Sequence, residues 1–237
     1  NIIVELDDGI KENATIIGID KGTDLAVLKI NSNKELTSIE IGDSNELKIG
    51  DVVLAIGNPY GLGQSVSMGI VSATGREFDN PFSDYIQTDA SINRGNSGGA
   101  LIDTEGRLIG INTLIKSTSG GSEGVGLSIP SITVLSIVND LIQYGEVKRG
   151  WLGFGIDRRE VTRGNLVVSS IVKDGPADKA SLKIGDKIVQ INEEKGTYKN
   201  LYQQFARSKP GLKINLTVDR NSTILEIELK TEVLPKN

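Results

Sequence analysis

The chain has 237 residues, enough for one large domain and one small one, and its 38% hydrophobic content is ordinary for a globular protein. Its net charge of −5 argues against binding to nucleic acid or to an anionic membrane, because both surfaces are themselves negative. The absence of Cys and His excludes a disulfide and a thiol nucleophile and argues against a zinc or copper site, so we expect no metal and no cofactor.

The first part of the chain is a series of short β-rich runs separated by Gly, Asp or Asn. This spacing predicts an antiparallel sandwich or barrel rather than alternating β and α units. The longest apolar run, 52–56, is far shorter than the roughly 20 residues that cross a bilayer. The predicted strands cover residues 2–6, 14–19, 25–30, 52–56, 65–73, 101–102 and 108–114.

The first predicted helix comes late, at residues 131–144. It follows Pro130, repeats apolar residues on one face and meets Gly145, a frequent helix stop. We interpret it as the end of a first domain, 1–148. The second domain, 149–237, is expected to contain several strands and two short helices, at 176–181 and 198–207.

One serine is framed by glycines, in the run Gly95-Asn96-Ser97-Gly98-Gly99. Such a loop suits a nucleophile, because glycine leaves the backbone N–H groups uncovered for an oxyanion. The run also fits the G-x-S-x-G motif of α/β-hydrolases, but that motif needs a histidine after the serine and none follows. A plain glycine turn is the other alternative.

Asp24 stands at the start of the apolar run 25–30, well upstream of Ser97. The acid then precedes the serine along the chain, as it does in chymotrypsin-like proteases. By itself an aspartate in this position is more often a turn-capping residue, so its interpretation depends on the rest of the chain.

Four motifs in order resemble the HtrA (Deg) family of serine proteases, and the resemblance covers essentially the whole chain. They are Thr-Asp-Leu-Ala-Val-Leu-Lys at 23–29, Ala-Ile-Gly-Asn-Pro-Tyr-Gly-Leu at 55–62, Gln-Thr-Asp-Ala-Ser-Ile-Asn at 87–93 and Gly-Asn-Ser-Gly-Gly at 95–99. The resemblance implies a mainly β fold, a trypsin-like double β-barrel followed by a smaller α+β PDZ domain.

The same resemblance implies catalytic roles for three residues. Ser97 would be the nucleophile, Asp24 the orienting acid, and the N–H groups of Gly95 and Ser97 the oxyanion hole. The family's catalytic histidine belongs to a Thr-Asn-x-His-Val type motif, which we expect upstream of residue 1. The 237 residues alone are therefore expected to be nearly inert, because serine without a base keeps its proton.

The run from Arg149 to Phe154 predicts a loop whose N–H groups cradle a terminal carboxylate beside a strand open to pairing. The runs 175–180 and 183–192 resemble the helix and following strand of a PDZ domain, permuted as in bacterial proteases. The predicted groove lies between strand 152–156 and helix 198–207, where Tyr202 and Phe205 either line the groove or pack in the core. The expected peptide-binding residues are Trp151, Leu152, Gly153 and Phe154.

A single PDZ domain is most similar to the DegS branch of the family. That resemblance implies a periplasmic homotrimer, anchored in the inner membrane through a segment upstream of residue 1. Such a stress sensor would cleave an anti-sigma factor when its PDZ domain binds C-termini of misfolded outer-membrane proteins. The resemblance also implies that Arg76, expected in a polar loop reaching to Pro81, and Tyr60 regulate the oxyanion hole, although an exposed arginine is more often merely solvated.

A binding module is the main alternative to an enzyme. In that case the protease fold has lost its chemistry, and the PDZ domain acts alone as a peptide receptor. A histidine in the upstream sequence would discriminate between the two.

Overall fold

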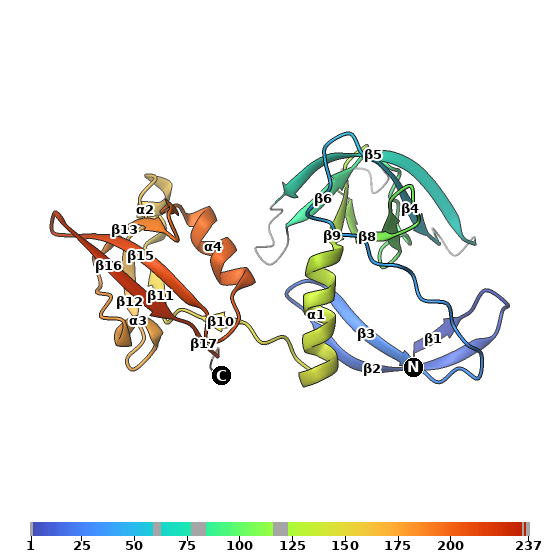
Figure 1. The fold of residues 1–237 in the computed structure, drawn as a ribbon, viewed down its shortest axis with the longest axis horizontal. Helices are drawn as coiled ribbons and strands as arrows, with labels where there is room; N and C mark the ends of the chain where they lie inside the picture. Colours follow the sequence, from blue (N-terminus) through green and yellow to red (C-terminus); the bar gives the residue numbers. More distant parts are fainter. Residues whose placement is uncertain (1, 59–62, 77–83, 116–122, 234, 236–237) are drawn as a thin grey trace. The chain divides into compact units, whose positions relative to one another are not determined.

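The computed structural model describes residues 2–58, 63–76, 84–115, 123–233 and 235 (Figure 1). The chain divides into two compact units, Asn1–Val147 and Lys148–Asn237. Each unit has its own hydrophobic core. No helix within the described ranges is long and apolar enough to cross a membrane.

The first unit begins with a three-stranded antiparallel sheet in the order β1-β2-β3. A tight turn joins β2 to β3, and it is held by Asp20, whose carboxylate accepts hydrogen bonds from the backbone N–H (3.1 Å) and hydroxyl (2.5 Å) of Thr23. The strands are β1 (Ile2–Glu5), β2 (Lys11–Asp20) and β3 (Leu25–Ile30).

Six further strands form a closed barrel in the order β4-β5-β6-β9-β8-β7. Pairing of β4 with β7 closes it, with Leu54 opposite Ile102 and Ala55 opposite Leu101. Alternate residues along the strands point inward and form a buried aliphatic cluster that includes Val53, Val71, Ile86 and Leu101. The strands are β4 (Val52–Gly57), β5 (Ser65–Arg76), β6 (Tyr85–Thr88), β7 (Ala100–Ile102), β8 (Leu108–Ile115) and β9 (Gly126–Pro130).

Helix α1 (Ser131–Tyr144) ends the first unit and packs against strands of both the sheet and the barrel. It buries Val134, Ile137 and Leu141. Gly145 ends the helix in the left-handed conformation (φ 72°) and donates its N–H to the carbonyl of Leu141, a standard helix stop.

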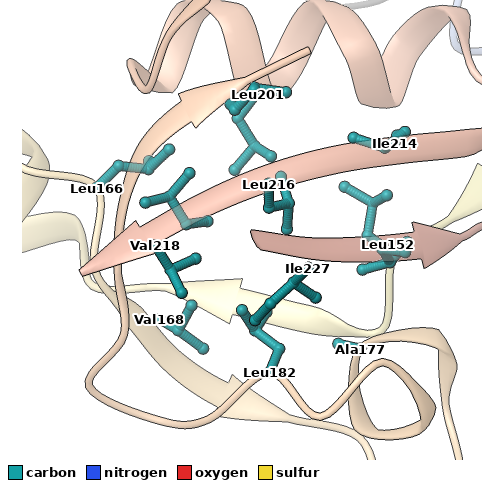
Figure 2. Close-up of a cluster of buried hydrophobic side chains, with 13 residues drawn as sticks. Leu152, Leu166, Val168, Ala177, Leu182, Leu201, Ile214, Leu216, Val218 and Ile227 are labelled. Atoms are coloured by element: carbon teal, nitrogen blue, oxygen red, sulfur yellow. The ribbon is translucent and has the colours of Figure 1, made fainter. Parts of the chain in front are cut away.

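The second unit is built on a four-stranded antiparallel sheet, β14-β13-β15-β16, with two strand pairs, β10-β17 and β11-β12, and three helices. Figure 2 shows its core, in which side chains from the sheet meet Leu152, Ala177 and Leu201. The elements are β10 (Gly150–Trp151), β11 (Phe154–Ile156), α2 (Arg158–Thr162), β12 (Val168–Ile171), α3 (Pro176–Lys179), β13 (Lys187–Ile191), β14 (Glu194–Lys195), α4 (Tyr198–Arg207), β15 (Lys213–Arg220), β16 (Thr223–Lys230) and β17 (Glu232–Val233).

The structure is mainly β, as the sequence predicted. Of the two predicted barrels, the described residues contain one closed barrel and, for the other, the three-stranded sheet β1-β2-β3. The short helix predicted at 176–181 ends earlier, at Lys179, because Ser181 adopts a left-handed backbone conformation (φ 62°) that no helix continues through.

Candidate active site and peptide-binding loop

Ser97 lies at a surface cavity of about 370 Å³ in the first unit. Its hydroxyl is exposed and donates to the carbonyl of Thr113 on β8, at 2.8 Å. The cavity lies between the end of β4 and the loop 95–99 that carries Ser97, which we call the serine loop. Its lining residues are Ile56, Gly57, Asn58, Gln64, Gly95, Ser97, Gly99 and Ala100.

The backbone of the serine loop is folded by its own hydrogen bonds. The N–H of Asn96 donates to Asn93 (3.0 Å), and the N–H of Gly99 donates to Asn96 (3.0 Å). Glycine is required at 99, because a Cβ there would lie 2.0 Å from the carbonyl oxygen of Ile56. Two N–H groups, those of Gly95 and Ser97, have no acceptor among the described residues, and both residues line the cavity.

Asp24 is the last residue of the turn between β2 and β3, with an exposed side chain and a left-handed backbone (φ 59°). Its neighbour Leu25 packs against the same buried cluster as Ile111 of β8, which lies two residues before Thr113. Within the described ranges no hydrogen bond joins Asp24 to Ser97, and the sequence has no histidine to bridge them.

The structure describes one of the two residues expected to regulate the site. Arg76 is not in a loop but is the last residue of β5, opposite Tyr85, and its Nε donates to Oε1 of Gln87 at 3.0 Å. The strand continues past residue 73, where the sequence predicted its end, because Gly75 adopts φ 71° at a register irregularity of the ladder, the conformation of a β-bulge. Tyr60 lies outside the described residues.

Sequence reasoning missed Asn112, a fully buried amide in β8. Its main chain bonds to the serine loop, and its side-chain NH₂ donates to one carbonyl on β4 and one on β7. A polar residue in the middle of an otherwise apolar run was the available signal.

In the second unit, the loop Trp151–Phe154 is anchored through its carbonyls and side chains. Leu152 accepts the N–H of Ala177 (3.1 Å), and Gly153 accepts that of Val172 (2.8 Å). The Leu152 side chain is buried in the core. Within the described ranges the N–H groups of Leu152 and Gly153 have no acceptor, so they are free to bind a ligand.

Two features of the structure require glycine at position 153. Its φ is 75°, and a Cβ would lie 2.9 Å from Cδ of Pro176. Trp151 packs on Gly175 in a similar way, because a Cβ on Gly175 would lie 3.1 Å from the indole ring. The loop is therefore held tightly against the start of α3.

Strand β11 continues from this loop and pairs on one side with β12, Phe154 lying opposite Ile171. Its other edge is unpaired in the described sheets. On α4, Leu201 points into the core (Figure 2), whereas Tyr202 stacks on Tyr198 with ring centres 5.5 Å apart. Burial, with a smaller contribution from Tyr198, raises the pKa of Tyr202. The side chain of Phe205 lies outside the described residues.

No group of three or more potential metal ligands occurs in the part of the chain that the structure describes. The polar groups at both loops are instead hydroxyl and backbone N–H groups, which suit an oxyanion or a carboxylate.

These features define a trypsin-like peptidase joined to a PDZ domain. A model of the trypsin-like peptidase domain matches residues 2–111, and a model of the PDZ domain matches residues 150–231. The chain belongs to the HtrA family of serine proteases, which confirms the resemblance and the predicted fold class.

Three similar proteins illustrate the relationship. The probable periplasmic serine endoprotease DegP-like of Bartonella henselae is 41% identical over 246 residues, covering 99% of this chain and 48% of the relative. The periplasmic pH-dependent serine endoprotease DegQ of Escherichia coli is 43% identical over 244 residues, covering 96% and 53%. A solved structure, the HtrA-type protease AlgW with decapeptide, is 43% identical with a TM-score of 0.84, covering 99% of this chain and 76% of that one. The chain spans about half the length of these curated relatives.

Proposed function

We propose that this chain carries the serine endopeptidase and peptide-sensing parts of a periplasmic HtrA protease. Ser97 is the nucleophile, Asp24 the orienting acid, and the N–H groups of Gly95 and Ser97 the oxyanion hole. The observation that carries the proposal is one cavity lined by an exposed serine hydroxyl and two N–H groups without acceptors in the described residues. The names of the curated relatives support the periplasmic assignment.

The general base is a histidine upstream of residue 1, held by Asp24. As Ser97 Oγ attacks the scissile carbonyl carbon, its proton passes to the imidazole and then to the leaving amine. The hydroxyl bond to Thr113 is exchanged for a bond to the imidazole in this step. The resulting acyl-enzyme is hydrolysed by water, which returns a proton to Ser97 by the same route.

The second unit captures a peptide C-terminus. The carboxylate binds the free N–H groups of loop 151–154, and the peptide extends along the open edge of β11. The decapeptide in the AlgW structure supports a peptide ligand. By the same likeness we propose a DegS-like stress-response role: an inner-membrane-anchored homotrimer that cleaves an anti-sigma factor once outer-membrane-protein C-termini bind.

Two substitutions in the longer, histidine-containing protein test the catalytic assignment. Ser97→Ala is expected to lower kcat by roughly 10⁶-fold, and Asp24→Asn by roughly 10⁴-fold, with folding retained. Asparagine is the appropriate change at 24 because it tolerates the left-handed backbone there. Cleavage of an unfolded protein substrate is measured. Equal rates for Ser97→Ala and its parent refute the proposal.

The inactive receptor is the competing candidate, and it depends only on the free N–H groups of loop 151–154 in the second unit. It predicts no cleavage by the longer protein, with or without Ser97, while a free-carboxylate peptide still binds the second unit. The same cleavage assay together with calorimetry therefore separates the two functions.

A further inference from the structure

Asn112 lies fully buried in β8, directly behind the serine loop. A buried amide must find internal partners for both its NH₂ and its oxygen, because an unmade bond there carries the full desolvation cost. The partners of Asn112 are the two strands that line the cavity, the loop that carries Ser97, and Ser128 of β9.

The side-chain NH₂ joins β4 to β7 at the point where these strands separate. Direct pairing ends at Ala55 opposite Leu101. The next residue on each strand, Ile56 and Ala100, offers a carbonyl that accepts from Nδ2 of Asn112, at 3.2 and 3.0 Å. Both of these residues line the cavity, so the amide links two of its walls.

Ser128 determines which way the amide faces. It is fully buried on β9, directly opposite Asn112 in the strand register. Its hydroxyl donates to Oδ1 of Asn112 at 2.9 Å. The amide oxygen is thereby held towards β9, which leaves the NH₂ facing the two carbonyls.

The main chain at 112–113 holds the serine loop itself. The N–H of Asn112 donates to Gly99 and its carbonyl accepts from Gly98, both at 2.8 Å. The next carbonyl, that of Thr113, accepts the Ser97 hydroxyl. A shift of Asn112 therefore moves the nucleophile relative to the cavity wall.

We propose that Asn112, oriented by Ser128, is a positioning residue that aligns Ser97 and the free N–H groups of Gly95 and Ser97 with the substrate carbonyl. Its effect on catalysis rests on the proposed function, whereas its hold on the loop can be measured without activity.

The kinetic test uses the longer, histidine-containing enzyme with Asn112→Asp, Ser128→Ala and a control, Ser131→Ala. The aspartate is isosteric but places an oxygen against the carbonyls of Ile56 and Ala100. Ser131 is also fully buried and donates its hydroxyl to Gly42 (2.7 Å), so the control removes a comparable bond away from the serine loop. We expect kcat to fall about 100-fold in Asn112→Asp and about tenfold in Ser128→Ala, with KM within about threefold and the control within about twofold of the parent.

The second measurement is amide hydrogen exchange at Gly98 and Gly99 in the 237-residue chain. Both site variants are expected to exchange at least about tenfold faster there than Ser131→Ala does. If the longer parent does not cleave, the proposed function fails and exchange alone decides the role of Asn112. If Asn112→Asp does not fold, Ser128→Ala carries the test. The proposal is overturned if Ser128→Ala has the same kcat as Ser131→Ala and the same exchange rates at the Gly98 and Gly99 amides.

Discussion

At the scale of single residues, Arg76 shows how position changes an expected role. As the last residue of β5 it is held by Gln87, one strand away, and by pairing opposite Tyr85. An arginine fixed to a strand end is better suited to transmit a shift of that strand than one solvated in a loop.

We therefore predict that Arg76→Ala in the longer enzyme lowers peptide-stimulated cleavage severalfold. The peptide Kd of the second unit should stay within about twofold, because the substitution changes the proposed regulation of the oxyanion hole and not the peptide-binding loop. Lys29→Ala, an exposed cation on β3, is the charge-matched control. Cleavage rates against peptide concentration give both quantities. Full peptide activation of Arg76→Ala removes the regulatory role.

A second residue-scale feature is the ion pair between Asp186 and Arg220 in the second unit. Arg220 donates from Nε and Nη2 to the two carboxylate oxygens, both at 2.7 Å, and the N–H of Lys183 adds a third bond (2.8 Å). Burial alone would raise the pKa of Asp186, but the bonds from Arg220 and Lys183 outweigh it and hold the pKa below its ordinary value of 3.8.

The lowered pKa of Asp186 determines how the stability of the second unit depends on pH. A carboxyl with a lowered folded pKa stabilises the fold above its unfolded pKa, and the contribution is lost as pH falls below 3.8. Arg220→Met leaves a buried, unpaired carboxylate and should cost about 3–5 kcal/mol at pH 7. The variant should regain stability on acidification, where the parent loses it. Urea midpoints at pH 7 and at lower pH measure both, and parallel pH curves contradict the assignment.

At the scale of elements, the loop between β10 and β11 combines buried carbonyls with free N–H groups. This arrangement predicts that a peptide with a free apolar C-terminus binds about 10 to 100-fold more tightly than its amide, since charge-assisted bonds to the carboxylate are lost. Calorimetry on the two peptides measures the ratio. Equal affinities exclude the loop as the carboxylate site.

Gly153→Ala should weaken the same binding, because a Cβ meets Pro176 and must displace the loop. Gly164→Ala is the matched control: its φ of 81° imposes similar backbone strain, but nothing lies within 4 Å of its Cβ. A loss of affinity in both variants would point to general destabilisation instead.

The elements that could be predicted from sequence are those with local signals. Helix α1 was predicted at its observed bounds because Pro130 and Gly145 mark both ends. The end of β5 was predicted three residues too early, at 73 instead of Arg76, because the bulge at Gly75 can be recognised only from the pairing with β6. Asn112 was missed because one of its acceptors, Ile56, lies 56 residues away and is brought near only by barrel closure.

At the scale of the whole molecule, each unit has a complete core. One buried cluster draws only on residues 152–229, and the other two only on residues of the first unit. We propose the domain boundary at 148/149, one residue after the point where the two compact units divide. Brief trypsin treatment should then cut first after Lys148 or Arg149 and leave a second unit that unfolds cooperatively. Mass spectrometry of the fragments and melting of the smaller one check this. Early cuts within 152–229 contradict it.

The short open edge of β11 limits which peptide segments can pair with it. An unpaired strand edge can pair with any extended chain. The edge of β11, however, is only three residues long and has a register irregularity between Gly155 and Ile156. It is followed directly by α2, which Asp157 caps. At about 3.3 Å per residue, this short edge can pair with only about three residues of a peptide. With the terminal carboxylate bound to loop 151–154, as proposed, those few residues are the last of the chain. In a mixture of unfolded proteins, the second unit would then bind free C-termini and not the far more numerous internal segments.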